Sequence, residues 1–252
     1  MTNRPSVLIP IAPGTNRNQE LADAFALAGA EASQVPLQAL RDGETKLVDH
    51  QMLALPGGFS YGDALGAGRL LGLDLTSWFA DQLHEAVAIG MPVIGICNGF
   101  QVLVRSGLLP GNDIPAALVD NHSGRFECRW VTLAPQANES VWLNGITDNL
   151  RCPVAHAEGR LVVADDAGRT AKPAFRYVES DGSPALGHPA NPNGSVDNIA
   201  GLVDDSGLVL GLMPHPEDHV EPFQNPLRGR GRGNDGLCLG LFEAGIDAVT
   251  GS

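Results

Sequence analysis

The chain has 252 residues, of which 43% are hydrophobic, so it is long enough to bury one large core without disulfide support. Its 16 basic and 29 acidic side chains give a formal net charge of −13, which argues against nucleic acid or an anionic membrane as the main partner. Its four cysteines lie far apart and form no C-x-x-C pair, which disfavours a disulfide framework or a zinc ribbon.

The N-terminal segment MTNRPSVLIPIAPG contains an apolar run that is short and interrupted by proline, unlike the core of a signal peptide. No stretch approaches the roughly 20 consecutive apolar residues that a membrane-spanning helix needs. We therefore expect a soluble, cytoplasmic protein that does not bind membranes.

The first hundred residues alternate between strand and helix patterns. Ser6–Ala12 and Met52–Gly58 are short apolar runs closed by glycine-containing turns, and Pro92–Ile96 is a third such run, so each predicts a buried strand. Between them, the apolar spacing of residues 21–28 and of Asp74–Ile89 predicts two helices, each followed by glycine. Strands that alternate with helices predict βαβ units and a parallel sheet.

The second half has a different pattern. Arg125–Leu133 mixes aromatic and β-branched residues, as half-buried strands do, and Asn198–Met213 predicts a hairpin with its turn at Asp204–Gly207. We find no internal repeat or low-complexity linker. The sequence therefore predicts one α/β domain over residues 1–252, in which antiparallel strands from the second half extend the parallel sheet.

A cysteine stands between the third predicted strand and a polar, helix-like segment. The five residues Gly95-Ile96-Cys97-Asn98-Gly99 have the form of a nucleophile elbow with cysteine in place of serine. A helix N-terminus beneath the sulfur favours the thiolate, and its free N–H groups can hold an oxyanion. The alternative is a buried packing cysteine whose glycine neighbours only allow close contact.

A thiol nucleophile needs a base, and His215 is the best candidate among the seven histidines, whereas His84 is expected on a helix surface. The segment LGLMPHPE places His215 just past an apolar strand, and the ends of parallel strands meet at one edge of a sheet. Glu217 can accept a hydrogen bond from the imidazole as the third member of a triad. The alternatives are a simple turn histidine or a zinc pair with His219, which Pro216 disfavours because such a pair needs a helix.

The glycine pair in ALPGGFSYGD follows the second predicted strand. Gly57 and Gly58 can turn backbone N–H groups towards a reacting carbonyl, as an oxyanion hole requires. They can equally cradle a phosphate or form an ordinary loop, but neither a P-loop nor a dinucleotide-binding pattern follows.

These three pieces, in this order, resemble the class I glutamine amidotransferases. SGLLPG, SGRFECRWV, AHAEGR and NPNGS extend the resemblance over residues 52–217, towards the branch of the family that supplies ammonia in purine biosynthesis. The opening segment APGTNRNQE is similar to the start of that branch but lacks the acidic residue expected just after it. The resemblance implies a single flavodoxin-like domain, with a mostly parallel sheet flanked by helices and added antiparallel strands.

The resemblance also implies a mechanism. Cys97 would attack the side-chain amide of glutamine, which gives a γ-glutamyl thioester and ammonia, while His215 moves the proton and Glu217 orients it. Backbone N–H groups near Gly58 and Asn98 would stabilise the oxyanion. The other residues that the resemblance implies in oxyanion or substrate binding are Gly57, Phe59, Gln101, His156 and Glu158.

The chain has no room for the second large domain that an ATP-dependent amidation needs. The resemblance therefore implies an ammonia-supplying subunit, which works with a separate synthetase subunit that uses ATP and magnesium and with a small third subunit. No metal or organic cofactor is expected in this chain. Residues 228–236, RGRGRGNDG, are expected to form a flexible solvated loop, with a partner contact as the alternative.

Other functions share the cysteine turn. A γ-glutamyl hydrolase, another stand-alone class I glutaminase and a protease-like thiol enzyme all fit it, although PHPE favours the amidotransferase. A catalytically silent binding subunit would have no need of Cys97, His215 and Glu217 together. The remaining cysteines are expected to be packing residues: Cys128, Cys152 and Cys238.

Overall fold

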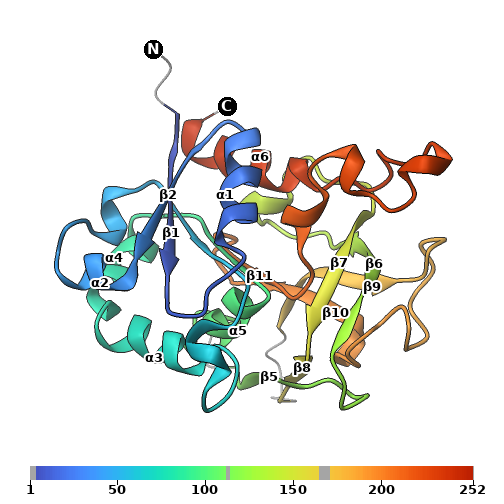
Figure 1. Cartoon of the computed structure of the whole chain (residues 1–252), viewed down its shortest axis with the longest axis horizontal. Helices are drawn as coiled ribbons and strands as arrows, with labels where there is room; N and C mark the ends of the chain where they lie inside the picture. Colours follow the sequence, from blue (N-terminus) through green and yellow to red (C-terminus); the bar gives the residue numbers. More distant parts are fainter. Residues whose placement is uncertain (1–3, 112–113, 165–170, 252) are drawn as a thin grey trace.

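The computed structural model of the chain describes residues 4–111, 114–164 and 171–251, so both ends of the predicted domain, residues 1 and 252, lie outside it. Within these residues a nine-stranded sheet runs through the molecule in the order β2-β1-β3-β4-β11-β10-β9-β6-β7 (Figure 1). No helix of this described part is both long and apolar enough to cross a membrane.

The first five strands of that order pair in parallel and form a flavodoxin-like half-sheet. Three of them are buried along their whole length, which is the pattern of parallel strands with both faces covered. Their bounds are β1 Ser6–Ile11, β2 Glu31–Pro36, β3 Met52–Leu55, β4 Val93–Ile96 and β11 Val209–Leu212. The predicted strands at Ser6–Ala12, Met52–Gly58 and Pro92–Ile96 are therefore confirmed.

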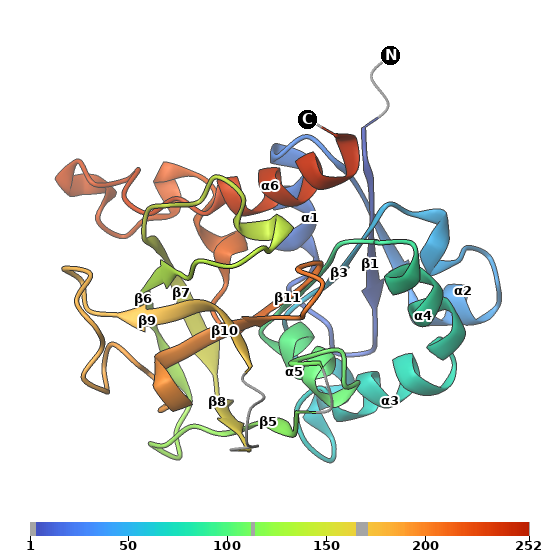
Figure 2. The same ribbon diagram turned by 180° about the vertical axis from the view of Figure 1, so that it is seen from behind.

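Helices cover both faces of the parallel half. One face carries α1 (Asn18–Leu27) and α6 (Leu239–Thr250), which meet through an edge-to-face contact of Phe25 and Phe242 with ring centroids 5.1 Å apart (Figure 1). The opposite face, seen in Figure 2, carries three helices. They are α3 Arg69–Ser77, α4 Ala80–Ala88 and α5 Asn98–Arg105, and a short α2, Leu37–Arg41, follows β2.

The other strands of the large sheet pair in antiparallel fashion, as predicted. The hairpin predicted at Asn198–Met213 is formed by β10 and β11, and β11 also joins β4, so it connects the two halves of the sheet. The antiparallel strands are β10 Ile199–Val203, β9 Lys172–Val178, β6 Glu127–Pro135 and β7 Leu150–His156, and a separate pair is formed by β5 Ala116–Asp120 and β8 Glu158–Val163.

The single helix predicted at Asp74–Ile89 is wrong, because the chain turns at Trp78 and Phe79 and forms two helices, α3 and α4. Phe79 leaves helical geometry and is only 1% exposed, whereas Trp78 stays at the surface beneath the Arg41 guanidinium. The apolar spacing is continuous across this break because both helices bury their apolar residues on the same side of the sheet (Figure 2).

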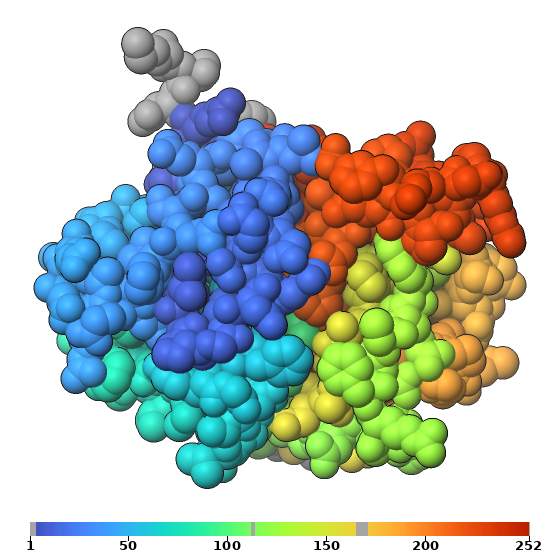
Figure 3. All heavy atoms as spheres, viewed as in Figure 1, coloured from blue at the N-terminus to red at the C-terminus, as the bar shows by residue number. Residues whose placement is uncertain are grey.

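The chain folds so that distant segments meet beside the parallel strands. Figure 3 shows the cyan residues that follow β3 lying next to yellow residues of β7 and β8, on the face seen in Figure 1. This places the predicted glycine loop beside the AHAEGR segment, at the edge of the sheet where β3, β4 and β11 end.

Candidate active site

Cys97 occupies a strained turn at the end of β4. Its backbone has φ 51° and ψ −105°, a left-handed conformation that non-glycine residues rarely adopt, and α5 begins at the next residue. A Cβ at Gly95 would lie 2.6 Å from the Gly99 carbonyl oxygen, and a Cβ at Gly99 would lie 2.1 Å from the Leu55 carbonyl oxygen. Both glycines are therefore needed for the close approach of α5 to the strands, which holds the turn in place.

This close approach gives a stability prediction. Gly99→Ala should destabilise the fold by roughly 3 kcal/mol, because no flexible side chain can yield to the new methyl group. The midpoint temperature of thermal unfolding should then fall by roughly 6–12 °C. Gly240→Ala is the matched control, since nothing lies within 4 Å of its added Cβ in α6. If both variants melt at the wild-type temperature, the tight contact of α5 with β3 is not required.

His215 lies just past β11, the parallel neighbour of β4, and its Nδ1 is 2.7 Å from Glu217 Oε1. The two side chains are almost fully buried, at 4% and 0% exposed. The His215 backbone N–H donates to the Pro153 carbonyl, and a Cβ at Gly57 would lie 2.8 Å from His215 Cε1. The imidazole is therefore held by Glu217 on one side and by the flat surface of Gly57 on another.

The electrostatics of His215 favour its charged form. Burial lowers the pKa of the imidazole, but the Glu217 carboxylate and the Cys97 side chain, which interacts with it by charge and by hydrogen bond, raise it by more. The pKa of His215 consequently lies well above its ordinary value. An imidazolium beside a sulfur is the arrangement that activates a thiol as a nucleophile.

The predicted oxyanion loop follows β3. Gly58 has φ +122°, and a Cβ there would lie 2.7 Å from the backbone nitrogen and the side-chain oxygen of Asn16. The Phe59 N–H donates to the Gly14 carbonyl, so that donor is already engaged. Asn98 is the first residue of α5, where a backbone N–H has no intrahelical partner and is available to an anion.

A small cavity of about 50 Å³ lies beside this turn, and Cys97 is one of its lining residues. Six predicted site residues line it, whereas Gly57, Asn98, His215 and Glu217 are not among the lining residues. The lining residues are Gly58, Phe59, Asp63, Ala67, Cys97, Gln101, Ala155, His156, Ala157 and Glu158.

Three of the predicted binding residues, Asn98, Gln101 and Glu158, are joined by hydrogen bonds beside the cavity. The Asn98 side-chain nitrogen donates to Gln101 Oε1 at 2.9 Å, and Gln101 Nε2 donates to the Glu158 carbonyl at 2.5 Å. Both ends of the Gln101 amide are thus engaged within the protein. His156, in contrast, is 4% exposed and its Nδ1 has no hydrogen-bond partner among the described residues.

Asp63 also lines the cavity, although the sequence did not predict it as a candidate site residue. It lines the cavity with Glu158, and burial together with the charge of Glu158 raises the pKa of Asp63 to about 6. None of the lining residues is a lysine or arginine. Two carboxylates that share a cavity with no cation favour a ligand that carries a positive group.

A second missed feature braces the segment that carries Glu217. Arg17 Nη2 forms an ion pair with both carboxylate oxygens of Asp218, and Arg17 also pairs with Glu20 at 3.1 Å. Burial and the charge of Glu217 raise the pKa of Asp218 to about 6, although Arg17 opposes this shift. The loop between β1 and α1 is therefore tied to the segment that carries the triad.

The other predicted side chains are placed as follows. His84 is exposed on α4, as predicted. Cys152 and Cys238 are buried in the core, but Cys128 is exposed on β6, so the packing role expected for it is wrong. Among the described residues, no group of three or more His, Cys, Asp or Glu side chains is arranged to hold a metal ion.

Comparison with known proteins identifies relatives over nearly the whole chain. Residues 4–247 match the family described as the CobB/CobQ-like glutamine amidotransferase domain. The chain is 42% identical to the phosphoribosylformylglycinamidine synthase subunit PurQ of Treponema denticola, an alignment that covers 98% of this chain and 99% of that one. It is 36% identical to the PurQ subunit of Thermotoga maritima, with 86% and 90% of the two chains covered.

Solved structures of glutamine amidotransferases also resemble this chain over nearly its whole length. A chain in the structure of PurLQS from Thermotoga maritima superimposes with a TM-score of 0.77 at 32% identity, covering 97% of this chain and 99% of that one. A second glutamine amidotransferase from Thermotoga maritima superimposes with a TM-score of 0.60 over the full length of both chains. At 16% identity, this second match shows a common fold alone.

Proposed function

Because the chain belongs to the family of CobB/CobQ-like glutamine amidotransferases, we propose that it is the glutaminase subunit of a phosphoribosylformylglycinamidine synthase. In this function it hydrolyses the side-chain amide of glutamine and passes the ammonia to a separate synthetase subunit of purine biosynthesis in the cytoplasm. The observation that carries the proposal is the buried His215–Glu217 pair beside Cys97 in a chain similar to PurQ subunits from end to end.

The first half-reaction forms a thioester. The Cys97 sulfur attacks the amide carbon of glutamine, and negative charge develops on the amide oxygen, where the N–H groups of Gly58 and Asn98 stabilise it. The C–N bond then breaks, and the protonated His215 delivers its proton to the departing nitrogen, which leaves as ammonia. Glu217 holds the imidazole through Nδ1, so Nε2 is the nitrogen that faces the reaction.

The second half-reaction releases the acyl group from the Cys97 sulfur. A water molecule gives a proton to the now neutral His215 and attacks the thioester carbon. The C–S bond breaks, glutamate is released and the sulfur regains its negative charge beside the imidazolium. The cycle consumes one glutamine and one water and releases one glutamate, one ammonia and the proton of the new carboxyl group, and it needs no metal or organic cofactor in this chain.

Substrate recognition completes the proposal. Free glutamine carries an α-ammonium group, and the Asp63 and Glu158 carboxylates in the cavity provide the negative charge that such a group requires. When the ammonium enters, the ionised form of Asp63 is favoured, because the positive charge offsets the repulsion by Glu158 that raises the pKa of Asp63.

Asp63→Asn should raise the KM for glutamine roughly tenfold or more and leave kcat within about threefold, because a charge-assisted hydrogen bond is lost. Wild-type kcat/KM should fall as the pH drops through about 6, since Asp63 is then protonated in the free enzyme. This fall of kcat/KM at low pH should be smaller in Asp63→Asn. The check is kcat/KM from pH 5 to 8, with the exposed Asp247→Asn as the matched control. An unchanged KM in Asp63→Asn would remove Asp63 from substrate binding.

We also propose that the chain assembles with a synthetase subunit, which uses ATP and magnesium, and with a small third subunit. The related chain of the PurLQS structure supports this arrangement. The test is reconstitution: glutamine should support ATP-dependent product formation only when this chain and the synthetase subunit are both present. A γ-glutamyl hydrolase or a stand-alone glutaminase would instead release ammonia or cleave γ-glutamyl peptides equally well without the partner.

A further inference from the structure

A second cavity, of about 300 Å³, lies between the β6–β7 strands and the loop that contains RGRGRGNDG, and it shares no lining residue with the cavity at Cys97. In Figure 1 this C-terminal segment, drawn in red, lies above the ends of β6 and β7. The lining residues are Thr132, Asn149, Arg151, Ser180, Leu227, Arg232, Asp235 and Gly236.

Arg151, on β7, lines this cavity and has an unsatisfied hydrogen-bond donor. Its Nη1 atom is buried and has no hydrogen-bond partner, and within residues 4–111, 114–164 and 171–251 its guanidinium forms no ion pair. The guanidinium carbon is 5.8 Å from the centroid of the Trp130 ring, near the outer limit of cation–π attraction, and the ring supplies no hydrogen-bond acceptor to Nη1. A buried donor that makes no hydrogen bond destabilises a protein. A ligand that supplies an acceptor to Nη1 would therefore bind favourably here.

The rest of the lining strengthens this positive character. Arg232 adds a second guanidinium, and the single lining carboxylate, Asp235, already pairs with Arg232 Nε at 2.5 Å. Burial and the nearby Arg232 lower the pKa of Arg151, and Asp235 only partly opposes them. Neutral donors complete the wall, namely the side chains of Thr132, Asn149 and Ser180.

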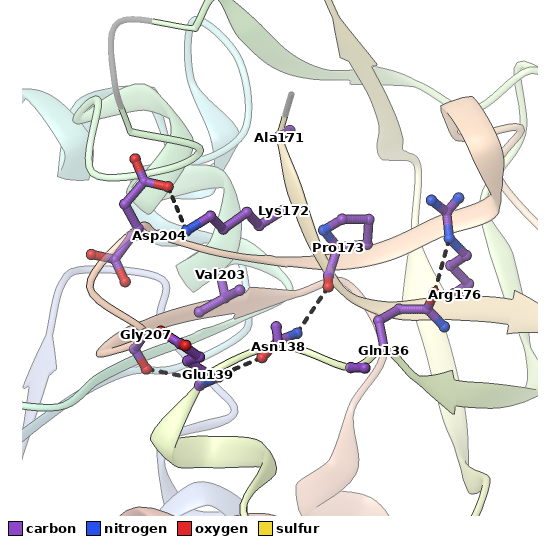
Figure 4. A pocket seen from close by; sticks show the side chains of 13 residues that line it. Gln136, Asn138, Glu139, Ala171, Lys172, Pro173, Arg176, Val203, Asp204 and Gly207 are labelled. Atoms are coloured by element: carbon purple, nitrogen blue, oxygen red, sulfur yellow. Dashed lines mark hydrogen bonds and ion pairs between the residues drawn. The ribbon is translucent and has the colours of Figure 1, made fainter. Parts of the chain in front are cut away.

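A larger cavity of about 550 Å³ provides the contrast (Figure 4). There Lys172 is paired with Asp205 at 2.7 Å, and Arg176 donates through Nε to Gln136 at 3.2 Å. The cations of that cavity are satisfied by the protein itself. The cavity at Arg151 is different, because Nη1 of the Arg151 guanidinium is buried and has no hydrogen-bond partner among the described residues.

We propose that the 300 Å³ cavity binds a small anion through a phosphate or carboxylate group held by Arg151 and Arg232. Guanidinium groups present paired N–H donors that match the oxygens of both groups, and hydroxyl and amide side chains supply the remaining hydrogen bonds. The volume lies at the lower end of the range for ligand pockets and excludes large ligands. This inference does not depend on the proposed function.

The bound anion would lie next to the segment that carries His215 and Glu217. The Arg151 carbonyl lies 2.5 Å from His219 Nδ1 and also accepts from the Cys238 thiol at 3.7 Å. His219 closes the short helix Pro216–His219 that contains Glu217, and its Nε2 lies 3.3 Å from the Gly233 carbonyl of the loop. An anion that fixes Arg151 and the loop would thereby brace the segment behind the active site.

The test is calorimetric titration of the full-length chain with inorganic phosphate, with chloride added to hold the ionic strength constant. We expect saturable binding at one site and a rise of roughly 3 °C in the unfolding temperature at a tenfold excess over Kd. Arg151→Met and Arg232→Met should abolish both signals. Arg228→Met removes the same charge from the same loop but lies outside the lining, and it should bind phosphate like the wild type.

The absence of saturable binding in the wild type would overturn the proposal. So would an equal loss in Arg228→Met, which would indicate general attraction to a basic loop, or full binding by a folded Arg232→Met. If Arg151→Met does not fold, phosphate binding by Arg232→Met still tests the proposal, because Arg232 is exposed and its replacement leaves the core intact. Repeating the titration with the synthetase subunit present identifies the natural source of the anion: binding that persists indicates a free anion, and binding that is lost indicates a partner carboxylate in the cavity.

Discussion

Cys97→Ala should abolish glutamine-dependent product formation by the reconstituted enzyme, with a loss of roughly 10⁴-fold or more. The reason is that every step of the proposed cycle passes through the sulfur, and no other thiol lines the cavity. The same variant should keep synthesis from ammonium chloride at the wild-type rate, because the synthetase step does not use this site. The two rates are measured in one assay with either nitrogen source.

The matched control is Cys128→Ala, which removes an exposed thiol from β6 and should leave both activities unchanged. Glutamine-driven synthesis that survived in Cys97→Ala would contradict the catalytic assignment outright. Loss of the ammonium-driven rate as well would indicate a failure of subunit assembly, which gel filtration of the mixed subunits detects.

The turn at Cys97 and the His215–Glu217 pair were predictable because each is encoded within a few residues of sequence. Gly95, Cys97 and Gly99 place a turn between an apolar strand and a helix, and PHPE brings a base and its carboxylate together two residues apart. Parallel strand ends converge by geometry, so two local patterns predicted one site. The structure then adds the contacts that explain both glycines.

Asp63 was not predictable in the same way. It ends a short turn in which Tyr61, Gly62 and Asp63 all have positive φ, so the chain folds back and directs the carboxylate into the cavity. No periodicity encodes such a turn. The Arg17–Asp218 ion pair joins residues 201 positions apart, and only the finished fold brings them together.

Edge position explains why β2 was not predicted. β2 has the sequence EASQVP and is partly exposed along its length, so it lacks the apolar run that identified the inner strands. Its pairing with β1 is supplied by the backbone rather than by apolar side chains. The inner strands β3, β4 and β11 are fully buried, which is why their sequences alone were sufficient.

Glu217→Gln should lower kcat for glutamine hydrolysis roughly 10³-fold, with little change in KM because Glu217 does not line the cavity. The amide keeps the shape of the side chain but removes the charge that raises the pKa of His215. The imidazolium beside Cys97 is then disfavoured at neutral pH. The check is kcat and KM for ammonia release by the assembled complex, with the exposed Glu243→Gln on α6 as the matched control.

The pH dependence of stability provides a readout that is independent of turnover. The folded-state pKa of His215 is raised above its ordinary value of 6.5, so its contribution is fully present below about 6.5 and is lost as the pH rises through the folded pKa. In the wild type, part of the stability should therefore disappear on the alkaline side. Glu217→Gln lowers that pKa, so the loss should become smaller and move to lower pH.

Glu217 itself shows why the charge matters more than the hydrogen bond. Its Oε1 accepts from His215, but its Oε2 is buried and has no hydrogen-bond partner among the described residues. A carboxylate left half-satisfied in the core is costly, and an attraction to the imidazolium offsets that cost. If Glu217→Gln proves more stable than the wild type yet far slower, the protein keeps the charge for catalysis. A variant that is as fast as the wild type would mean that His215 needs no anionic partner.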